Sequence, residues 1–130
     1  MWLKEPEQRA ARLLLGHNYR GLRLRYWVDG TTSAWILDEI GKEEPITIGV
    51  VISDDLIRDV KILTYRESRG WEVRHPFFTD QFKGLALKSN QRLSERIDGI
   101  SGATLSVRAV TNVSRFALFL HQQIMTESEA

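Results

Sequence analysis

Residues 46–65 read ITIGVVISDDLIRDVKILTY, and this stretch decides the fold. Ile46 to Ile52 is rich in β-branched residues and predicts a buried strand. Ser53-Asp54-Asp55 is a turn sequence, and Asp59 to Tyr65 predicts a further strand. That strand would place three residues on one face, namely Val60, Ile62 and Thr64. The turn is too short for a crossover, so the two strands are predicted to run antiparallel.

The residues upstream extend the same pattern. Leu22 to Val28 alternates in hydrophobicity with a period of two, Asp29-Gly30 is a strong turn signal, and Ser33 to Asp38 predicts the second strand. A helix is expected before them, with Pro6 at its first position and Gly16 at its end. Four strands joined by short turns indicate an antiparallel meander.

The residues downstream are irregular until the last element. Arg66 to Pro76 is predicted to be an irregular loop, Thr79 to Lys83 a short helix, and Arg92 to Ile97 a short strand. From Ala103 to Ile124 apolar residues recur every three or four positions, which predicts a long helix. The sequence therefore predicts one α+β domain over residues 1–130. Its antiparallel β-sheet meander packs against an N-terminal helix and a long C-terminal helix.

The composition limits the chemistry that the side chains can perform. The 130 residues include no cysteine and only three scattered histidines, so disulfides, thiolate nucleophiles and a metal site are not expected. Redox chemistry would need a borrowed cofactor. The net charge is +1, yet residues 29–59 hold eight acids and two bases between basic flanks. We expect a docking partner at this acidic region.

The residues before the C-terminal helix carry the strongest functional signal. Asp98 to Ser106 reads DGISGATLS. Gly102 and Ala103 allow close approach of a ligand, and Ser101 and Thr104 add hydroxyls beside free N–H groups at a helix start. Two interpretations stay open from this pattern alone. Ser101 could cap the helix, or the segment could hold a phosphate.

Asp98 to Thr104 resembles a known motif. It matches the flavinylation pattern of aspartate, two residues, serine or threonine, glycine, alanine and threonine at every specified position. The pattern is typical of the FMN-binding domain in flavin subunits of the sodium-pumping quinone reductase and of Rnf-type electron-transport complexes. In that family a flavin transferase attaches FMN through its phosphate to the last threonine. The resemblance implies that Thr104 is the attachment site, and that Ser101, Gly102, Ala103 and Asp98 bind the cofactor.

Two upstream segments add to the resemblance, which covers roughly Asp29 to Leu120. Glu67-Ser68-Arg69-Gly70 is similar to a Glu-Thr-Pro-Gly loop of the family, and Gln81-Phe82-Lys83-Gly84 is similar to a following segment. Serine replaces the threonine and keeps its hydroxyl, whereas arginine replaces the proline and changes the geometry of the loop. The resemblance implies that Glu67, Ser68, Gly70 and Trp71 line the flavin pocket.

The resemblance also implies a role and a location. The chain would be an electron-transfer subunit rather than a stand-alone enzyme, with a flavin transferase and redox proteins as partners. It would face the periplasm or another extracytoplasmic space, with a targeting segment or membrane anchor outside this sequence.

Two other functions stay open from the residues. One is a module that binds FMN non-covalently, or no flavin, and acts in sensing or assembly. The other is nucleic-acid binding through Arg23, Arg25 and neighbouring aromatic residues. The low net charge and the absence of any nucleic-acid motif disfavour the second, so no nucleic acid is expected as a partner.

Overall fold

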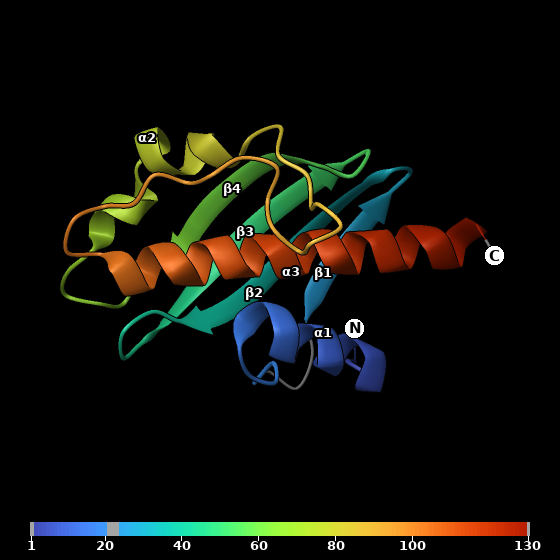
Figure 1. Cartoon of the computed structure of the whole chain (residues 1–130), viewed down its shortest axis with the longest axis horizontal. Coiled ribbons are helices and arrows are strands. Elements are labelled where there is room, and N and C mark those ends of the chain that lie inside the picture. Colours follow the sequence, from blue (N-terminus) through green and yellow to red (C-terminus); the bar gives the residue numbers. More distant parts are fainter. Residues whose placement is uncertain (1, 21–23, 130) are drawn as a thin grey trace.

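The computed structural model describes residues 2–20 and 24–129 and contains one sheet with helices on one side of it (Figure 1). The predicted strand residues Leu22 and Arg23 lie outside the described residues. The elements, in chain order, are α1 (Glu5–Leu15), β1 (Arg25–Asp29), β2 (Thr32–Ile40), β3 (Pro45–Ser53), β4 (Leu56–Thr64), the 3₁₀ helix η1 (Trp71–Arg74), α2 (Pro76–Thr79), the 3₁₀ helix η2 (Asp80–Phe82) and α3 (Thr104–Glu129).

The sheet is the antiparallel meander that the sequence predicts. The strand order is β1-β2-β3-β4, and each strand pairs antiparallel with the next. The β3–β4 connection is a two-residue turn in which Asp54 and Asp55 have φ values of 55° and 63°. A hairpin this tight needs left-handed backbone at both central residues, and aspartate tolerates it. The α+β class and the turn are therefore confirmed.

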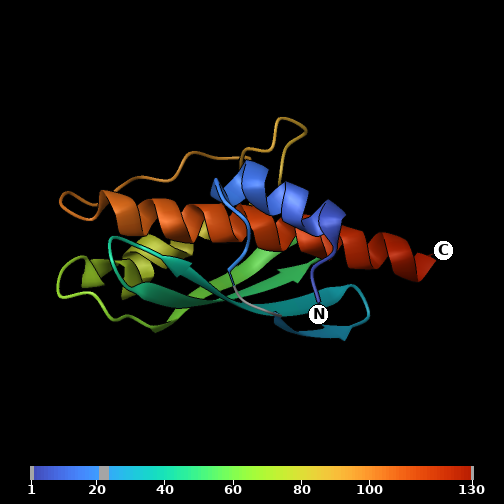
Figure 2. The ribbon, with the colours of Figure 1, turned by 90° about the horizontal axis from the view of Figure 1, so that it is seen from below.

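The core lies between the sheet and α3, which crosses one face of the sheet with α1 beside it (Figure 2). Alternate residues of β3, from Ile46 to Ile52, are almost completely buried on this face. A register shift at Val51/Ile52 interrupts the alternation, so Ile57 and Val60 of β4 are both buried. The prediction that Thr64 lies on the same face as Val60 and Ile62 is wrong, because the register shift at Thr47/Ile48 pairs Thr64 with Thr47 on the opposite face, where Thr64 is exposed.

The segment between the sheet and α3 differs in part from the prediction. The expected loop at Arg66 to Pro76 contains η1. The short helix predicted from Thr79 to Lys83 is present as η2, and α2, which was not predicted, directly precedes it. Arg92 to Ile97 is not a strand within the described residues. It contributes only an isolated bridge between Leu87 and Leu93. None of the helices in the described ranges is long and apolar enough to cross a bilayer.

A polar chain inside the core connects the sheet to α3. His121 is 1% exposed, and its Nδ1 lies 2.6 Å from the Ser33 Oγ. That hydroxyl accepts a hydrogen bond from the Trp35 indole at 2.6 Å, while the His121 Nε2 lies 3.4 Å from the Asp55 carboxylate. Serine, histidine and aspartate resemble a catalytic triad, but Ser33 is itself 1% exposed and cannot reach a substrate. The network is structural.

The network predicts sensitivity to acid. Burial lowers the pKa of His121 below its usual value, although Asp55 and Asp54 oppose this. The unfolded chain then binds more protons than the folded chain once the pH falls below about 6.5. We expect the thermal midpoint to fall between pH 7.5 and 5.5, and to fall less in His121→Gln, which cannot titrate here. Exposed His75→Gln is the control and should follow the wild type. An unchanged pH dependence in His121→Gln would contradict this interpretation.

Candidate functional site

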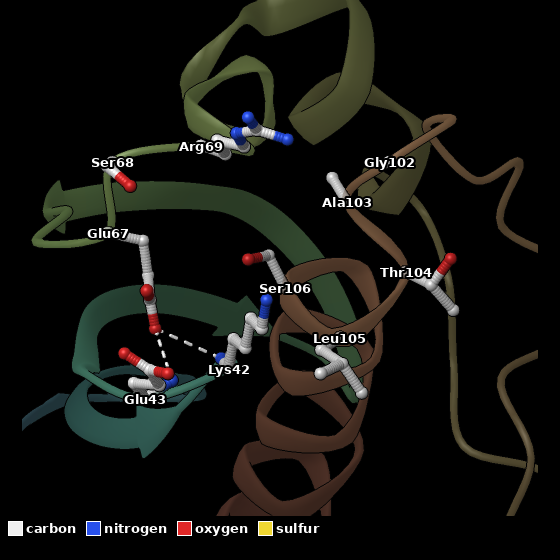
Figure 3. Close-up of a pocket in the computed structure, with 10 residues that line it drawn as sticks. All are labelled: Lys42, Glu43, Glu67, Ser68, Arg69, Gly102, Ala103, Thr104, Leu105 and Ser106. Carbon is white, nitrogen blue, oxygen red and sulfur yellow. Dashed lines mark hydrogen bonds between the residues drawn. The ribbon is translucent and has the colours of Figure 1, made fainter.

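Three segments far apart in sequence meet at the start of α3 and enclose a hollow of about 440 Å³ (Figure 3). They are the β2–β3 loop, the loop after β4 and the residues around the helix start. A hollow of this volume falls within the usual range for cofactor pockets, roughly 300–1,000 Å³. The lining residues are Lys42, Glu43, Glu67, Ser68, Arg69, Gly102, Ala103, Thr104, Leu105 and Ser106.

Ser106, in the first turn of α3, is the point where the loops contact the helix. Its side chain is buried, and its Oγ lies 3.0 Å from the Tyr65 hydroxyl, which donates to the Arg69 carbonyl. Gly70 has a φ of 83°, and a Cβ there would lie 2.5 Å from the Tyr65 oxygen and 3.3 Å from the Ser106 Oγ. Gly41 approaches the same oxygen, since its Cβ would lie 3.2 Å away. Because Gly70 and Gly41 have no side chains, both loops can pack closely against Ser106.

Glu67 holds the β2–β3 loop in place. Its Oε1 accepts hydrogen bonds from three successive backbone N–H groups, those of Lys42, Glu43 and Glu44, at 3.1, 2.5 and 2.7 Å. The bonds from Glu43 and Glu44 are the main reason why the pKa of Glu67 is lowered. The predicted pocket residue therefore lines the hollow with one oxygen already engaged by the protein backbone.

The helix start favours the anion interpretation over the serine cap. The first helical hydrogen bond of α3 joins the Val107 N–H to the Ala103 carbonyl at 2.9 Å, so Ala103 occupies the N-cap position. Alanine has no oxygen with which to cap, and Ser101 lies two residues too early. Across residues 2–20 and 24–129, no side chain hydrogen-bonds the N–H of Thr104, Leu105 or Ser106. These donors are available to a ligand.

Thr104 is accessible to a second protein. It is the first residue of α3, its side chain is exposed, and its hydroxyl is turned away from Glu67 and Lys42 in Figure 3. Gly102, with a φ of 81°, turns the chain into the helix just before it. Because glycine adopts this backbone without strain, the motif brings Thr104 to the surface at the positive end of the helix dipole.

A smaller hollow of about 260 Å³ adjoins the first and shares three of its residues, Ser68, Arg69 and Gly102. It brings together the remaining predicted residues Gly70, Trp71 and Ser101, with Glu72 beside them. Trp71 is 54% exposed, and its ring centroid lies 5.0 Å from that of His75. Trp71 is therefore not an ordinary core residue, and an apolar ring beside it would cover much of its exposed surface.

Asp98 is the predicted site residue that lies outside both hollows. The structure instead fixes its backbone, because Gln81 accepts from the Asp98 N–H at 2.7 Å and donates to its carbonyl at 3.2 Å. Gln81 belongs to the segment Gln81-Phe82-Lys83-Gly84 that resembles the family. Its side-chain amide therefore connects this segment to the motif at Asp98 to Thr104. The role of the Asp98 carboxylate as a cofactor contact stays a prediction.

Sequence reasoning missed the two cations of the larger hollow, Lys42 and Arg69. Figure 3 shows the Lys42 amine directed into the hollow and the Arg69 guanidinium reaching toward Gly102 and Ala103. Arg69 occupies the position where the family pattern has proline, and this departure was the sequence signal that could have drawn attention to it. Two cations and free helix N–H groups fit the phosphate of FMN. Within the described ranges, no group of three histidine, aspartate or glutamate side chains could hold a metal ion.

The close approach at Gly70 can be tested by Gly70→Ala. The new methyl group would push the Tyr65 hydroxyl from Ser106, and the positive φ adds backbone strain. Gly84→Ala is a matched control, because Gly84 has a φ of 82° with nothing within 4 Å of a Cβ. By urea denaturation we expect Gly70→Ala to lose about 1–2 kcal/mol more than Gly84→Ala. Equal losses in the two variants would show that the contact contributes nothing.

Comparison with known proteins gives the family. A search of curated proteins finds no match for this chain. The family model of the FMN-binding domain matches residues 41–118, which is more than half of the chain. The matched range includes both loops, the motif at Asp98 to Thr104 and most of the buried part of α3. The chain therefore belongs to the FMN-binding domain family, and FMN is its cofactor.

Proposed function

We propose that this domain carries electrons on an FMN group joined by a phosphoester to Thr104. One observation carries the proposal. Thr104 is an exposed hydroxyl at the first position of a long helix, and no side chain of residues 2–20 or 24–129 caps the leading N–H groups of that helix. A phosphate attached there would lie at the positive end of the helix dipole, close to those free donors.

Attachment requires a hydroxyl and a separate enzyme. The Thr104 oxygen forms a bond to the phosphorus of an FMN donor, the bond from that phosphorus to its leaving group breaks, and the leaving group departs with the electron pair. The hydroxyl proton passes to a base. The described residues place no base in hydrogen-bond contact with Thr104, and its hydroxyl faces outward. A flavin transferase therefore supplies the base and the FMN donor in this proposal.

The protein's own residues hold and shape the site. Lys42 and Arg69 supply cationic hydrogen-bond donors for phosphate oxygens, and Gly102 and Ala103 let the phosphate approach the backbone. Ser68, Gly70 and Trp71 supply a hydroxyl, a close backbone approach and an apolar surface for the flavin ring. Bound FMN supplies the redox chemistry that these side chains lack.

Arg69 supports a second candidate function, non-covalent binding of FMN. The arginine lines both hollows, and its fixed fork of donors could hold a free phosphate without any bond to Thr104. In that case the domain would serve as a flavin sensor or assembly module. Denaturation separates the two functions, because it releases a non-covalent flavin and leaves a phosphoester intact.

The partners and location follow from the covalent form. Attachment needs a flavin transferase in the same compartment, and electron transfer needs redox proteins as donor and acceptor. We further propose, on the family resemblance, that the domain lies in the periplasm or an equivalent extracytoplasmic space and is associated with a membrane.

Thr104→Ala tests the covalent proposal. The wild type, produced together with a flavin transferase, should gain the mass of one FMN less one water, and the variant should gain nothing. Thr111→Ala is a matched control, since Thr111 lies two turns along the same face of α3 and should not affect attachment. Intact mass spectrometry under denaturing conditions is the measurement. A full adduct on Thr104→Ala, or none on the wild type, would contradict the proposal.

A further inference from the structure

A third hollow, of about 610 Å³, lies between the middle of α3 and the connection that precedes the motif. Figure 1 shows this connection, coloured yellow to orange, running along α3. Four cationic side chains line the hollow, Lys88, Arg92, Arg96 and Arg115. Glu95 is the one carboxylate among its lining residues. The lining therefore has an excess of three positive charges.

The four cations are not neutralised by the protein. Among the described residues, none of them forms a salt bridge. Arg115 is half-buried, and burial together with the nearby charge of Arg92 lowers its pKa. Arg115 loses hydration without gaining a counter-charge, and the exposed cations Lys88, Arg92 and Arg96 line the same hollow, so this collection of like charges costs free energy. An anionic ligand would remove that cost.

The hollow is formed before any ligand binds. A small hairpin carries Lys88 and Arg92 on its turn, closed by the bonds from the Lys88 N–H to the Arg92 carbonyl at 2.7 Å and from the Ser94 N–H to the Ala86 carbonyl at 2.9 Å. Arg115 fixes the hairpin to α3 by donating through Nε to the Gln91 carbonyl at 2.6 Å. The cations are therefore held on a rigid support, which reduces the ordering cost of binding.

We propose that this hollow binds a small molecule that carries a diphosphate group. An excess of three positive charges matches several phosphate charges better than one carboxylate, and guanidinium groups bind phosphate oxygens in a bidentate way. Leu93 and Ile97 in the lining offer an apolar surface for the organic part of the ligand. A nucleoside diphosphate has this chemistry.

The hollow is separate from the proposed attachment site and does not depend on it. Thr104, Thr111 and Arg115 lie on one face of α3, and seven residues of helix place Thr111 about 10 Å from Thr104. None of the residues that line the 610 Å³ hollow lines the hollows beside the motif. A failure of FMN attachment would therefore leave this proposal standing, and the reverse also holds.

Titration calorimetry with pyrophosphate and with ADP tests the proposal on the full chain. We expect saturable binding of both, weakened at least about tenfold in Arg92→Gln/Arg96→Gln, which removes two exposed cations. Arg58→Gln/Arg74→Gln removes the same charge from exposed positions elsewhere and should bind like the wild type. Lys88→Gln is a second test should the double variant unfold, which circular dichroism would show.

Amide chemical shifts in NMR identify the site of binding. Pyrophosphate should move the signals of residues 88–97 and 111–115 and leave those of residues 67–71 in place. Absence of saturable binding, equal weakening in the control pair, or shifts confined to residues 101–106 would overturn the proposal. Binding of a glutamate-rich peptide in the absence of binding by either phosphate probe would also overturn it, in favour of docking by an acidic protein.

Discussion

The contact of Ser106 with two glycine-containing loops is the constraint on which the site depends. The Ser106 oxygen meets the Tyr65 hydroxyl, while Gly70 and Gly41 approach it from different loops. A Cβ at Gly70 would clash with the Tyr65 hydroxyl, and a Cβ at Gly41 would make an unusually tight contact with Ser106. The contact joins the end of β4 and the β2–β3 loop to the first turn of α3. Because Ser106 is buried, Thr104 two residues earlier is presented at the surface of the same turn.

The fold could be predicted because its signals are local. The β-branched residues of Ile46 to Ile52 and the turn at Ser53-Asp54-Asp55 specify neighbouring strands without knowledge of the rest of the chain. The segment after β4 could not be predicted as well, since η1 and the bridge at Leu87 depend on packing against distant elements. The exposure of Thr64 has a similar origin, because register shifts in the β3–β4 pair disturb a strict period of two.

The sequence motif identified some residues of the candidate site, but not those that only tertiary contacts bring to it. Thr104 and its neighbours follow from the motif, and the structure gathers Ser68, Gly102 and Ala103 around one hollow. Lys42 has no local signal, because it enters the site through the β2–β3 loop. Three N–H groups of that loop donate hydrogen bonds to Glu67. The partners are more than twenty residues apart in sequence, so no local sequence pattern predicts the contact. The same limit applies to the Gln81 amide that holds Asp98.

The helix α3 lines two hollows with charged side chains, one at its start and one farther along its length. At the start of the helix, Lys42 and Arg69 share a hollow with Glu43 and Glu67, so the charges of its lining balance. One phosphate group there would accept hydrogen bonds from the free N–H groups of the helix. Farther along the helix, the residues that line the hollow around Arg115 have a net positive charge. One helix thus supports the hydroxyl proposed for attachment and the hollow proposed for anion binding, and the two hollows share no lining residue.

Peptide mapping of the protein produced with a flavin transferase identifies the residue that carries the flavin. Trypsin cleaves after Arg96 and Arg108 and releases residues 97–108, which contain Ser101, Thr104 and Ser106 as the only hydroxyl side chains. Fragmentation by tandem mass spectrometry identifies the modified residue. We expect FMN on Thr104, because Ser106 is buried and Ser101 lies outside the helix start. An unmodified peptide, or FMN on Ser101 or Ser106, would contradict it.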